Sequence, residues 1–357
     1  MKKNPVDHII KAAQRPEGLS LDDSLAVLDA ARCDLLSCLG AAYYFREMHY
    51  KREVTVHILN NVQNGLCPED CRYCAQSRSS HALIEQYPMK PESEILAEAE
   101  AAYEQGAFRY CMVFAGTGPS DERIDRLCTI IRDIKKKYPI EVCVSPGIVS
   151  PVQAVRLKSA GLDRLNHNLN TSERYYGHIC TTHSYNDRIG TLKAAKEAGL
   201  AVCSGVIVGM GEAASDVVDM AMRLRELKAE SIPVNFFMPV PGVAITSASG
   251  LSPEYCLRVL CLFRLINPSA EIRMAAGREM HLRSLEAMGL YAANSLFLQG
   301  YLNVRGAADT RTLQMIRDAG FTIKSEVPLD ELLAKASAYG EEDGIKTIKE
   351  LRPFRKQ

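Results

Sequence analysis

The sequence predicts an α/β fold built on a closed (β/α)8 barrel of the TIM type, with an N-terminal helical cap and a short helical C-terminal tail. From Glu53 onward, short apolar runs alternate with helical patterns, and this alternation is typical of parallel βαβ units. Eight alternations over about 250 residues match the usual size of a closed barrel. The 357-residue chain exceeds the usual range of one domain, but barrels often reach this length. A doubly wound open sheet is the structural alternative.

The expected elements divide the chain into three parts. Residues 1–50 form an N-terminal helical region, in which Leu21, Leu25 and Leu28 have helical spacing after a possible cap at Ser20. Residues 51–326 form the barrel, and residues 327–357 form a charged helical tail in which we recognise no chemistry. The eight expected strands are Val54–Leu59, Phe108–Phe114, Ile140–Ser145, Leu162–Leu169, Leu200–Val208, Ile232–Phe237, Glu271–Ala275 and Ala292–Leu298.

The amino-acid composition of the chain argues against several classes of function. The 43 basic residues are balanced by 43 acidic ones, so the chain has no basic footprint for nucleic acid. No apolar run approaches a membrane-spanning length, and no apolar signal-peptide core follows the basic start at Met1–Pro5. Twelve cysteines without a signal sequence indicate a reducing compartment, where cysteine serves metals, clusters or catalysis. We therefore expect a cytoplasmic protein without nucleic-acid or membrane partners.

The most informative stretch is Cys67-Pro-Glu-Asp-Cys71-Arg-Tyr-Cys74, which directly follows the polar run after the first expected strand. A closed zinc site needs four ligands, and this spacing offers three thiols and no histidine. Three thiolates suit a 4Fe–4S cluster whose fourth iron stays open. That iron can bind the amino and carboxylate groups of S-adenosylmethionine. The alternative is three unrelated buried thiols.

Three further cysteines lie on strands. In the second strand, Cys111 shares the less apolar face with Arg109, and in the third Cys143 shares it with Ser145. Cys203 takes the same position in the fifth strand. Because these faces converge inside one barrel, the three thiols indicate a second iron–sulfur site, although each alone reads as a small core residue. The remaining cysteines read as core thiols: Cys33, Cys38, Cys128, Cys256 and Cys261.

A row of amides follows the fourth strand. Asn166, Asn168 and Asn170 alternate with Leu165, His167 and Leu169, and Asn235 joins them by parity. Convergent amides can hydrogen-bond a ribose or a urea-like group, but they can also satisfy one another inside the barrel. We interpret His57, His167 and His183 as structural because they lack metal spacing. Two glycine-bearing turns, which carry Ala115 and Ile207, either approach a cofactor or are ordinary tight turns.

These motifs resemble those of a known enzyme family. The Cys67–Cys74 stretch, with Tyr73 before its last cysteine, resembles the radical S-adenosylmethionine motif, and residues from Val54 to Ala308 resemble the biotin synthase family. The matching runs are Asn61–Cys67, Asn166–Leu169, Val202–Gly205 and Ala276–Glu279. The resemblance implies a barrel enzyme, usually a homodimer, that converts dethiobiotin to biotin with flavodoxin or ferredoxin as electron donor. It also implies reductive cleavage of S-adenosylmethionine to a radical that abstracts hydrogen from the substrate.

Residue roles follow from the same resemblance. It implies that Cys67, Cys71 and Cys74 hold the 4Fe–4S cluster. It implies an auxiliary cluster, usually 2Fe–2S, that donates the sulfur and has the ligands Cys111, Cys143, Cys203 and Arg278. Parity sets Arg278 in register with Ile272 and Met274, so a bulge at Gly277 would be needed to turn it inward. The implied small-molecule contacts are Asn168 to cofactor and substrate, Asn166 and Asn235 to the ureido group, Asn170 to the ribose, and Arg188 to the methionine carboxylate.

Two positions depart from the family pattern. Asn170 stands where the family often has Asp, so the ribose contact loses its charge. Asn303-Val304 replaces a Thr-Thr pair that binds the substrate carboxylate in some members, and Cys180 has no assigned role. Two other functions stay open: a radical enzyme of the cluster-maturase kind acting on another small molecule, and a non-catalytic iron–sulfur protein. The four implied ligands of the auxiliary cluster argue against the maturase-like enzyme. The interior amide row argues against the non-catalytic iron–sulfur protein.

Overall fold

The computed structural model of the chain describes residues 5–336 and 344–355. The expectations for the basic first residues and for parts of the helical tail concern residues 1–4, 337–343 and 356–357, which lie outside the described residues.

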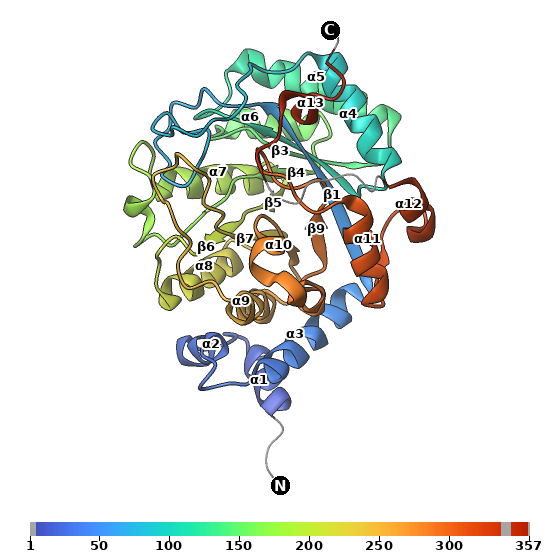
Figure 1. Cartoon of the computed structure of the whole chain (residues 1–357). Coiled ribbons are helices and arrows are strands. Elements are labelled where there is room, and N and C mark those ends of the chain that lie inside the picture. The colour runs from blue at the N-terminus through green and yellow to red at the C-terminus, as the bar shows by residue number, and fades with distance from the viewer. Residues whose placement is uncertain (1–4, 337–343, 356–357) are drawn as a thin grey trace.

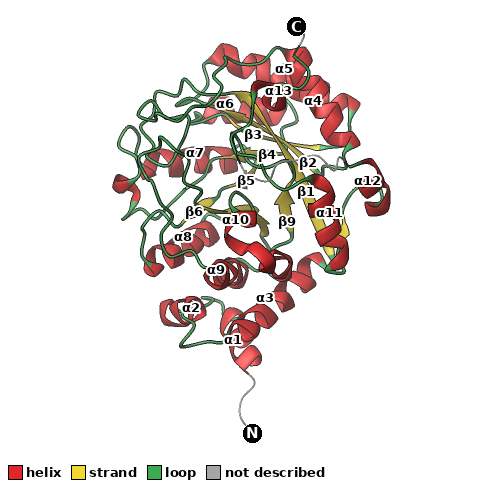
Figure 2. Ribbon diagram, in the orientation of Figure 1, coloured by secondary structure: helices red, strands yellow, loops and turns green. Residues whose placement is uncertain are grey.

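A closed parallel barrel forms the centre of the molecule, as the sequence predicts (Figure 2). Each strand pairs in parallel with the next, and β9 pairs back onto β1, so the sheet has no open edge and the doubly wound alternative is excluded. Its strands are β1 (Glu53–Gln63), β2 (Arg109–Phe114), β3 (Glu141–Ser145), β4 (Arg164–Asn166), β5 (Ala201–Cys203), β7 (Ser231–Phe236), β8 (Glu271–Met274) and β9 (Ser295–Phe297). Two short strands complete the sheet: β6 (Val206–Val208) beside β7, and β10 (Thr322–Ile323) beside the start of β1.

Helices surround the barrel (Figure 1). Those that follow the strands are α4 (Glu92–Glu104), α5 (Asp121–Lys137), α6 (Pro151–Ser159), α7 (Tyr185–Glu197), α8 (Ala214–Glu226), α9 (Pro253–Ile266) and α11 (Asp309–Asp318). Helix α5 illustrates why they form: Ser120 caps its first turn, Asp121 and Glu122 follow, and three lysines end it. Its buried face, which includes Ile124 and Ile131, packs toward the sheet.

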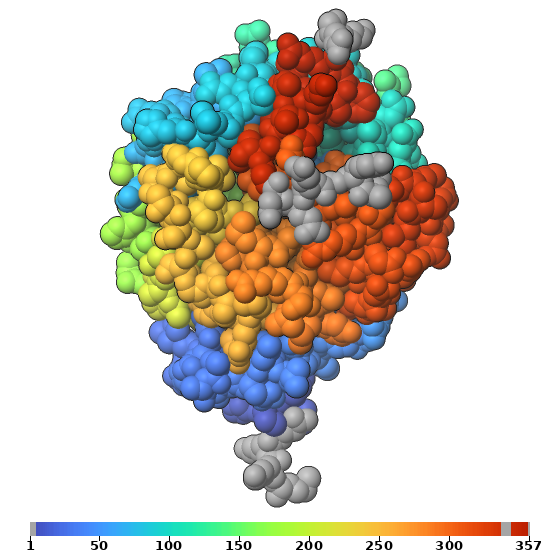
Figure 3. Space-filling model, viewed as in Figure 1, coloured from blue at the N-terminus to red at the C-terminus, as the bar shows by residue number. Residues whose placement is uncertain are grey.

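The N-terminal helices cover one end of the barrel (Figure 3). They are α1 (Pro5–Ala13), α2 (Leu21–Leu28) and α3 (Leu35–Tyr50), and α2 and α3 pack against α9. Ser20 caps α2 by accepting a hydrogen bond from the Asp23 amide at 3.1 Å. The buried Arg46 of α3 donates to the Leu290 carbonyl at 3.0 Å, which anchors this region to the end of the barrel.

Several strands differ from their expected limits, and the first, fourth and fifth are discussed in turn. Strand β1 continues to Gln63, so the polar run expected as a loop is largely strand. The fourth strand ends at Asn166. Beyond this residue the strand pairing stops, because the Gly205 amide donates its hydrogen bond to the Asn168 side-chain oxygen at 2.8 Å and not to a backbone carbonyl of the strand. The fifth strand breaks into β5 and β6 at Ser204-Gly205, where a Cβ on Gly205 would lie 2.6 Å from the Pro233 carbonyl oxygen.

The segments after β8 close the C-terminal side of the barrel. They begin with α10 (Arg278–Leu282) and a 3-10 segment at Arg283–Tyr291, and they end with α12 (Leu329–Lys335) and α13 (Ile348–Leu351). The described part of the tail returns to the barrel: the Lys346 amide donates to the Asn303 carbonyl at 2.8 Å, and Arg352 pairs with Glu94 at 2.6 Å. Among the described residues, no helix is both long and apolar enough to cross a membrane.

Candidate functional site

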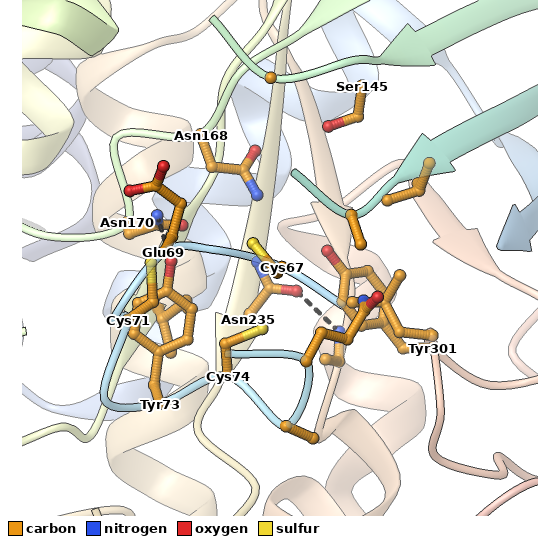
Figure 4. Close-up of a pocket in the computed structure, with 18 of the residues that line it drawn as sticks. Cys67, Glu69, Cys71, Tyr73, Cys74, Ser145, Asn168, Asn170, Asn235 and Tyr301 are labelled. Atoms are coloured by element: carbon orange, nitrogen blue, oxygen red, sulfur yellow. Dashed lines mark hydrogen bonds between the residues drawn. The ribbon is translucent and has the colours of Figure 1, made fainter. Parts of the chain in front are cut away.

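The loop that follows β1 carries Cys67, Cys71 and Cys74 into a cavity of about 270 Å³ at the C-terminal ends of the strands (Figure 4). Backbone hydrogen bonds hold the loop in shape: the Cys74 amide donates to the Cys71 carbonyl at 3.1 Å, and Cys67 forms a bridge with Ser77. Gly65, whose φ is +70°, makes the turn into the loop, and its amide donates to Gln76 at 2.9 Å. One short segment therefore presents all three motif cysteines to one cavity.

The surroundings of these three thiols favour their protonated form. Burial raises the pKa of Cys67, and burial raises the pKa of Cys74 to about 11. The pKa of Cys71 is raised first by its hydrogen bond to Cys180, whose own pKa that bond lowers to about 4. Thiolates form at such positions when a metal displaces the protons, so this donor set suits iron or another thiophilic metal.

Beside the motif loop, the amide row lines the same cavity (Figure 4). Asn170 has a left-handed φ of +67°, and its Nδ2 donates to the Tyr73 hydroxyl at 2.6 Å. Asn168 Oδ1 accepts hydrogen bonds from Asn166 Nδ2 at 3.0 Å and from the Gly205 amide. Asn166 also donates to the Cys203 sulfur at 3.3 Å, so the amide row connects the cavity to the strand cysteines.

Arg188 and Asn235 lie on the same cavity and are held by other groups. Arg188, from α7, donates to the Asn168 carbonyl at 2.8 Å and to the Tyr176 hydroxyl. Asn235 Nδ2 donates to the Val206 carbonyl at 2.8 Å, and its Oδ1 accepts from the Ala276 amide at 3.1 Å. The Asn235 side chain thus joins β6 to the end of β8, which leaves one of its N–H groups for a ligand.

The remaining predicted positions also line this cavity. Ala115 and Ile207 lie on its wall, in the two glycine-bearing turns. Asn303 and Val304 form another part of the wall, and Asn303 Oδ1 accepts a hydrogen bond from Asn64 at 2.6 Å. The chain thus brings all of the predicted small-molecule contacts to one cavity.

The strand cysteines form a separate group deeper in the barrel. Cys111 and Cys143 are register partners on β2 and β3, and Cys203 ends β5. The three thiols pack together with Ala275 and Phe297, and interactions with Cys111 and Cys203 raise the pKa of Cys143. The pKa of Cys203 is lowered, first by its hydrogen bond to Cys143 and also by the charge of Arg273. The parity argument for these strands therefore agrees with the observed packing.

Arg278 does not lie with these cysteines. Gly277, with φ +77°, ends the β8 segment and starts α10, so no bulge turns Arg278 into the barrel. Arg278 Nε donates to Glu286 at 2.9 Å, Nη1 to the Phe297 carbonyl at 3.0 Å and Nη2 to Thr312 at 3.1 Å. The expectation that Arg278 joins the strand cysteines is wrong for this structure, because a buried ion pair holds its guanidinium elsewhere.

Arg273 occupies the position expected for Arg278. Its Nη1 lies 3.9 Å from Cys203 Sγ, and its guanidinium lies 4.9 Å from the centre of the Phe297 ring. Glu271 pairs with Arg273 and accepts hydrogen bonds from Ser231 at 3.0 Å and from Arg109 at 3.1 Å. Strand parity could have found this layer, because Glu271 and Arg273 alternate with Ile272 and Met274 and so point inward with Ala275.

The interpretation of the histidines as structural agrees best with the surroundings of His57, whereas His167 and His183 both line the cavity. His57 is fully buried beside Arg109 and Glu271, and burial lowers its pKa well below the usual value. Burial lowers the pKa of His167 in the same way. His183 differs: its Nδ1 lies 2.7 Å from Glu69 and 3.3 Å from Cys180 Sγ, at the edge of the cavity.

Two family models and several curated proteins match this chain. A model described as the Radical SAM superfamily matches residues 63–224, and a model described as the Biotin and Thiamin Synthesis associated domain matches residues 233–322. The biotin synthase of Magnetococcus marinus is 52% identical over 313 residues, which are 88% of this chain and 97% of that protein. The biotin synthase of Leptospira interrogans is 47% identical over 346 residues, 96% of this chain and 97% of that protein.

Solved structures with lower identity share the fold. The FeFe-hydrogenase maturase HydG from Carboxydothermus hydrogenoformans superposes with a TM-score of 0.75 at 18% identity, covering 93% of this chain and 82% of that one. Methylornithine synthase gives a TM-score of 0.75 at 16% identity, covering 92% of this chain and 99% of that one. At such identity the likeness concerns the barrel alone.

Proposed function

The chain belongs to the biotin synthase family of radical S-adenosylmethionine enzymes, and from this premise we propose that its barrel inserts sulfur into dethiobiotin with two iron–sulfur clusters. The observation that carries the proposal is the arrangement of two separate groups of three thiols in one barrel. One group lies on the cavity and the other lies beneath it, connected by the Asn166 side chain. A non-catalytic iron–sulfur protein has no need of the cavity or of the amide row.

We propose Cys67, Cys71 and Cys74 as the ligands of the 4Fe–4S cluster. The donor set fits, because three thiols face one cavity and the motif contributes no fourth ligand. When bound, the clusters and S-adenosylmethionine supply radical hydrogen abstraction and a sulfur atom. The chain's own residues supply position: backbone bonds within the loop fix the thiols, and the walls of the cavity place the bound groups next to one another.

We propose that the cofactor binds along the amide row. Asn168 and Asn170 offer amide donors and acceptors to a ribose, and Arg188 offers a buried positive charge to a carboxylate. Arg188 is already oriented by Tyr176 and by the Asn168 carbonyl, so it need not be ordered at the moment of binding. Ala115 and Ile207 supply close wall positions in the two glycine-bearing turns.

For the auxiliary cluster we propose Cys111, Cys143, Cys203 and Arg273, with Arg273 replacing Arg278. Three thiols packed side by side beside one guanidinium fit a cluster whose fourth ligand is an arginine. Glu271, Ser231 and Ser295 hold Arg273 in its orientation toward Cys203. The position of this group beneath the substrate cavity supports its role as the sulfur source.

We propose that the substrate lies between the two groups of thiols. Asn166, Asn168 and Asn235 face this space from three segments of the barrel and can meet a ureido group. Asn303 replaces a hydroxyl of the family pattern at the far wall. Its Oδ1 is occupied by Asn64, so its N–H groups remain as donors for the substrate carboxylate.

The remaining proposals concern the whole chain. We propose a homodimer that receives electrons from flavodoxin or ferredoxin, with dethiobiotin as the substrate, as the family resemblance implies. We also propose that the protein acts in the cytoplasm, and the absence of disulfides among its twelve cysteines supports this. As functional units we propose residues 1–50 as a helical cap, 51–326 as the catalytic barrel and 327–357 as a tail.

Labelled sulfur tests the proposal. The protein is reconstituted anaerobically with isotopically labelled sulfide, freed of excess sulfide, and supplied with S-adenosylmethionine, dethiobiotin and reductant for one turnover. We expect biotin that carries the label, because the auxiliary cluster supplies the sulfur. Biotin without label would mean that the strand cysteines hold a purely structural group. Absence of any biotin, with S-adenosylmethionine still cleaved, would indicate a different substrate.

A further inference from the structure

We propose that the protein without its 4Fe–4S cluster binds a single thiophilic divalent ion, Zn²⁺ or Fe²⁺, through Cys71, Cys180 and His183. Cys180 and His183 lie in the segment between the turn at Tyr176–His178 and α7, and neither belongs to the proposed ligands of either cluster. The site lies at the edge of the cofactor cavity and shares one ligand with the first cluster. The ion site itself extends beyond the proposed function, and only its competition with the first cluster rests on that function.

The distances fit one tetrahedral ion. Cys71 Sγ and Cys180 Sγ lie 3.7 Å apart. Two thiolates at about 2.3 Å from one tetrahedral zinc ion are separated by roughly 3.8 Å, so the observed spacing needs almost no movement. His183 has ring nitrogens 3.3 and 3.9 Å from Cys180 Sγ, and one atom from each of the three residues lies within 4.8 Å of the others.

A carboxylate supports the histidine. Glu69 Oε2 lies 2.7 Å from His183 Nδ1, and Glu69 is buried and held by the hydroxyl groups of Thr117 and Thr182. A histidine that ligates a metal usually donates its other ring N–H to a carboxylate, which fixes the tautomer. With Nδ1–H donated to Glu69, Nε2, which lies 3.9 Å from Cys180 Sγ, is the nitrogen left to bind the ion.

One cation near the site has to adjust. Arg188 Nη2 lies 2.7 Å from His183 Nε2 and gives up this contact when the ion binds. Its other bonds, to Tyr176 and to the Asn168 carbonyl, remain. Two thiolates neutralise the charge of a divalent ion, so Arg188 then faces an overall neutral centre. Water can take the fourth position, because the site borders the open cavity.

Cys71 is a ligand in both the proposed ion site and the proposed 4Fe–4S cluster. Because Cys71 cannot serve both centres, a bound ion and the 4Fe–4S cluster exclude each other. An ion held by Cys71, Cys180 and His183 therefore delays cluster assembly, and removal of the Cys180 thiol relieves the delay.

Cobalt binding tests the proposal without S-adenosylmethionine or dethiobiotin, so the outcome is independent of the proposed function. The full-length protein is prepared free of iron, kept reduced under anaerobic conditions and titrated with Co²⁺. We expect one ion per chain, with thiolate-to-cobalt charge-transfer absorption and the visible bands of a tetrahedral site. Zn²⁺ should displace the cobalt. Failure to bind one Co²⁺ with these bands would overturn the proposal.

Variants identify the ligands. Cys180→Ser and His183→Ala should each weaken Co²⁺ binding by at least about tenfold to a hundredfold, the range seen when groups that support a metal are removed. Cys67→Ser, in the motif loop, and Cys256→Ser, buried in α9, are matched controls that should bind Co²⁺ as the unaltered protein does. Circular dichroism checks that each variant is folded. If Cys67→Ser weakens binding as much as Cys180→Ser does, the motif cysteines hold the ion and the proposal is wrong.

Cluster assembly gives a second measurement. Protein loaded with Zn²⁺ should form the 4Fe–4S chromophore more slowly than metal-free protein, and the difference should disappear in Cys180→Ser. An equal delay in Cys180→Ser would also overturn the assignment.

Discussion

The two groups of three cysteines have similar chemistry but are held in different ways. Cys67, Cys71 and Cys74 lie on one eight-residue stretch, and local backbone hydrogen bonds give that loop its shape. Cys111, Cys143 and Cys203 lie on three strands far apart in sequence, and the parallel register of the barrel brings them together. The loop group can therefore form wherever the loop folds, whereas the strand group exists only when the barrel is closed.

Their charged neighbours differ as well. Around the strand group lie Arg109, Arg164 and Arg273 together with Glu141 and Glu271, and the charge of Arg273 contributes to lowering the pKa of Cys111 and Cys203. Near the loop group the neighbouring charges are Glu69, Asp70 and Arg188. The strand group thus lies among buried arginine side chains, whereas the loop group lines the cavity.

Loss of a loop cysteine should have the largest effect. Cys71→Ala removes one of only three thiolates for the first cluster, so 5′-deoxyadenosine formation should fall below detection. The measurement is chromatography of the products after reduction with S-adenosylmethionine present. The auxiliary cluster should still form, because its ligands lie on the strands. Retained cleavage in this variant would contradict the assignment of the loop.

Loss of a strand cysteine should separate the two groups. Cys143→Ser removes the central thiol of the strand group, and biotin formation should stop. The rate of S-adenosylmethionine cleavage should stay within about twofold of that of the unaltered enzyme. Cleavage occurs at the loop group, and a change at a separate site has little effect on it. The two products are measured in the same reaction. Loss of both activities with the fold intact would show that the two groups are not independent.

The two arginines offer a sharper comparison. Arg278→Met removes the buried ion pair between Arg278 and Glu286 and should lower the free energy of unfolding by roughly 3 kcal/mol, with the auxiliary cluster spectrum unchanged. Arg273→Met should change that spectrum, because it removes the guanidinium beside Cys203. Urea denaturation and visible absorption of reconstituted protein measure the two effects. A changed cluster spectrum in the Arg278 variant alone would restore Arg278 as the ligand.

The smallest effect is expected at the edge of the loop group. Asn170→Asp restores a charge that the family often has, and both residues tolerate the left-handed backbone found there. The carboxylate can accept from the Tyr73 hydroxyl and make a charge-assisted bond to the ribose, so the affinity for S-adenosylmethionine should rise by about 0.5–1.5 kcal/mol. Equilibrium dialysis with the reconstituted protein measures it. An unchanged or weaker affinity would mean that Asn170 does not contact the ribose.

Much of the fold and half of the site follow from local patterns in the sequence. The alternation of apolar runs with capped helices determines the barrel, and the spacing of Cys67, Cys71 and Cys74 determines that their loop presents three thiols together. Strand parity determines that Cys111, Cys143 and Cys203 point inward, because successive side chains of a strand alternate between its faces. These properties need only the residues of one segment.

Other features were decided by contacts between segments far apart in the chain. The turn at Gly277 leads Arg278 to Glu286, and the register of β8 leaves Arg273 beside Cys203. Asn235 is engaged by the ends of β6 and β8, and Cys180 reaches Cys71 across more than a hundred residues. Periodicity gives the direction of a side chain but not its partner, since the partner depends on how the loops after different strands meet at the end of the barrel.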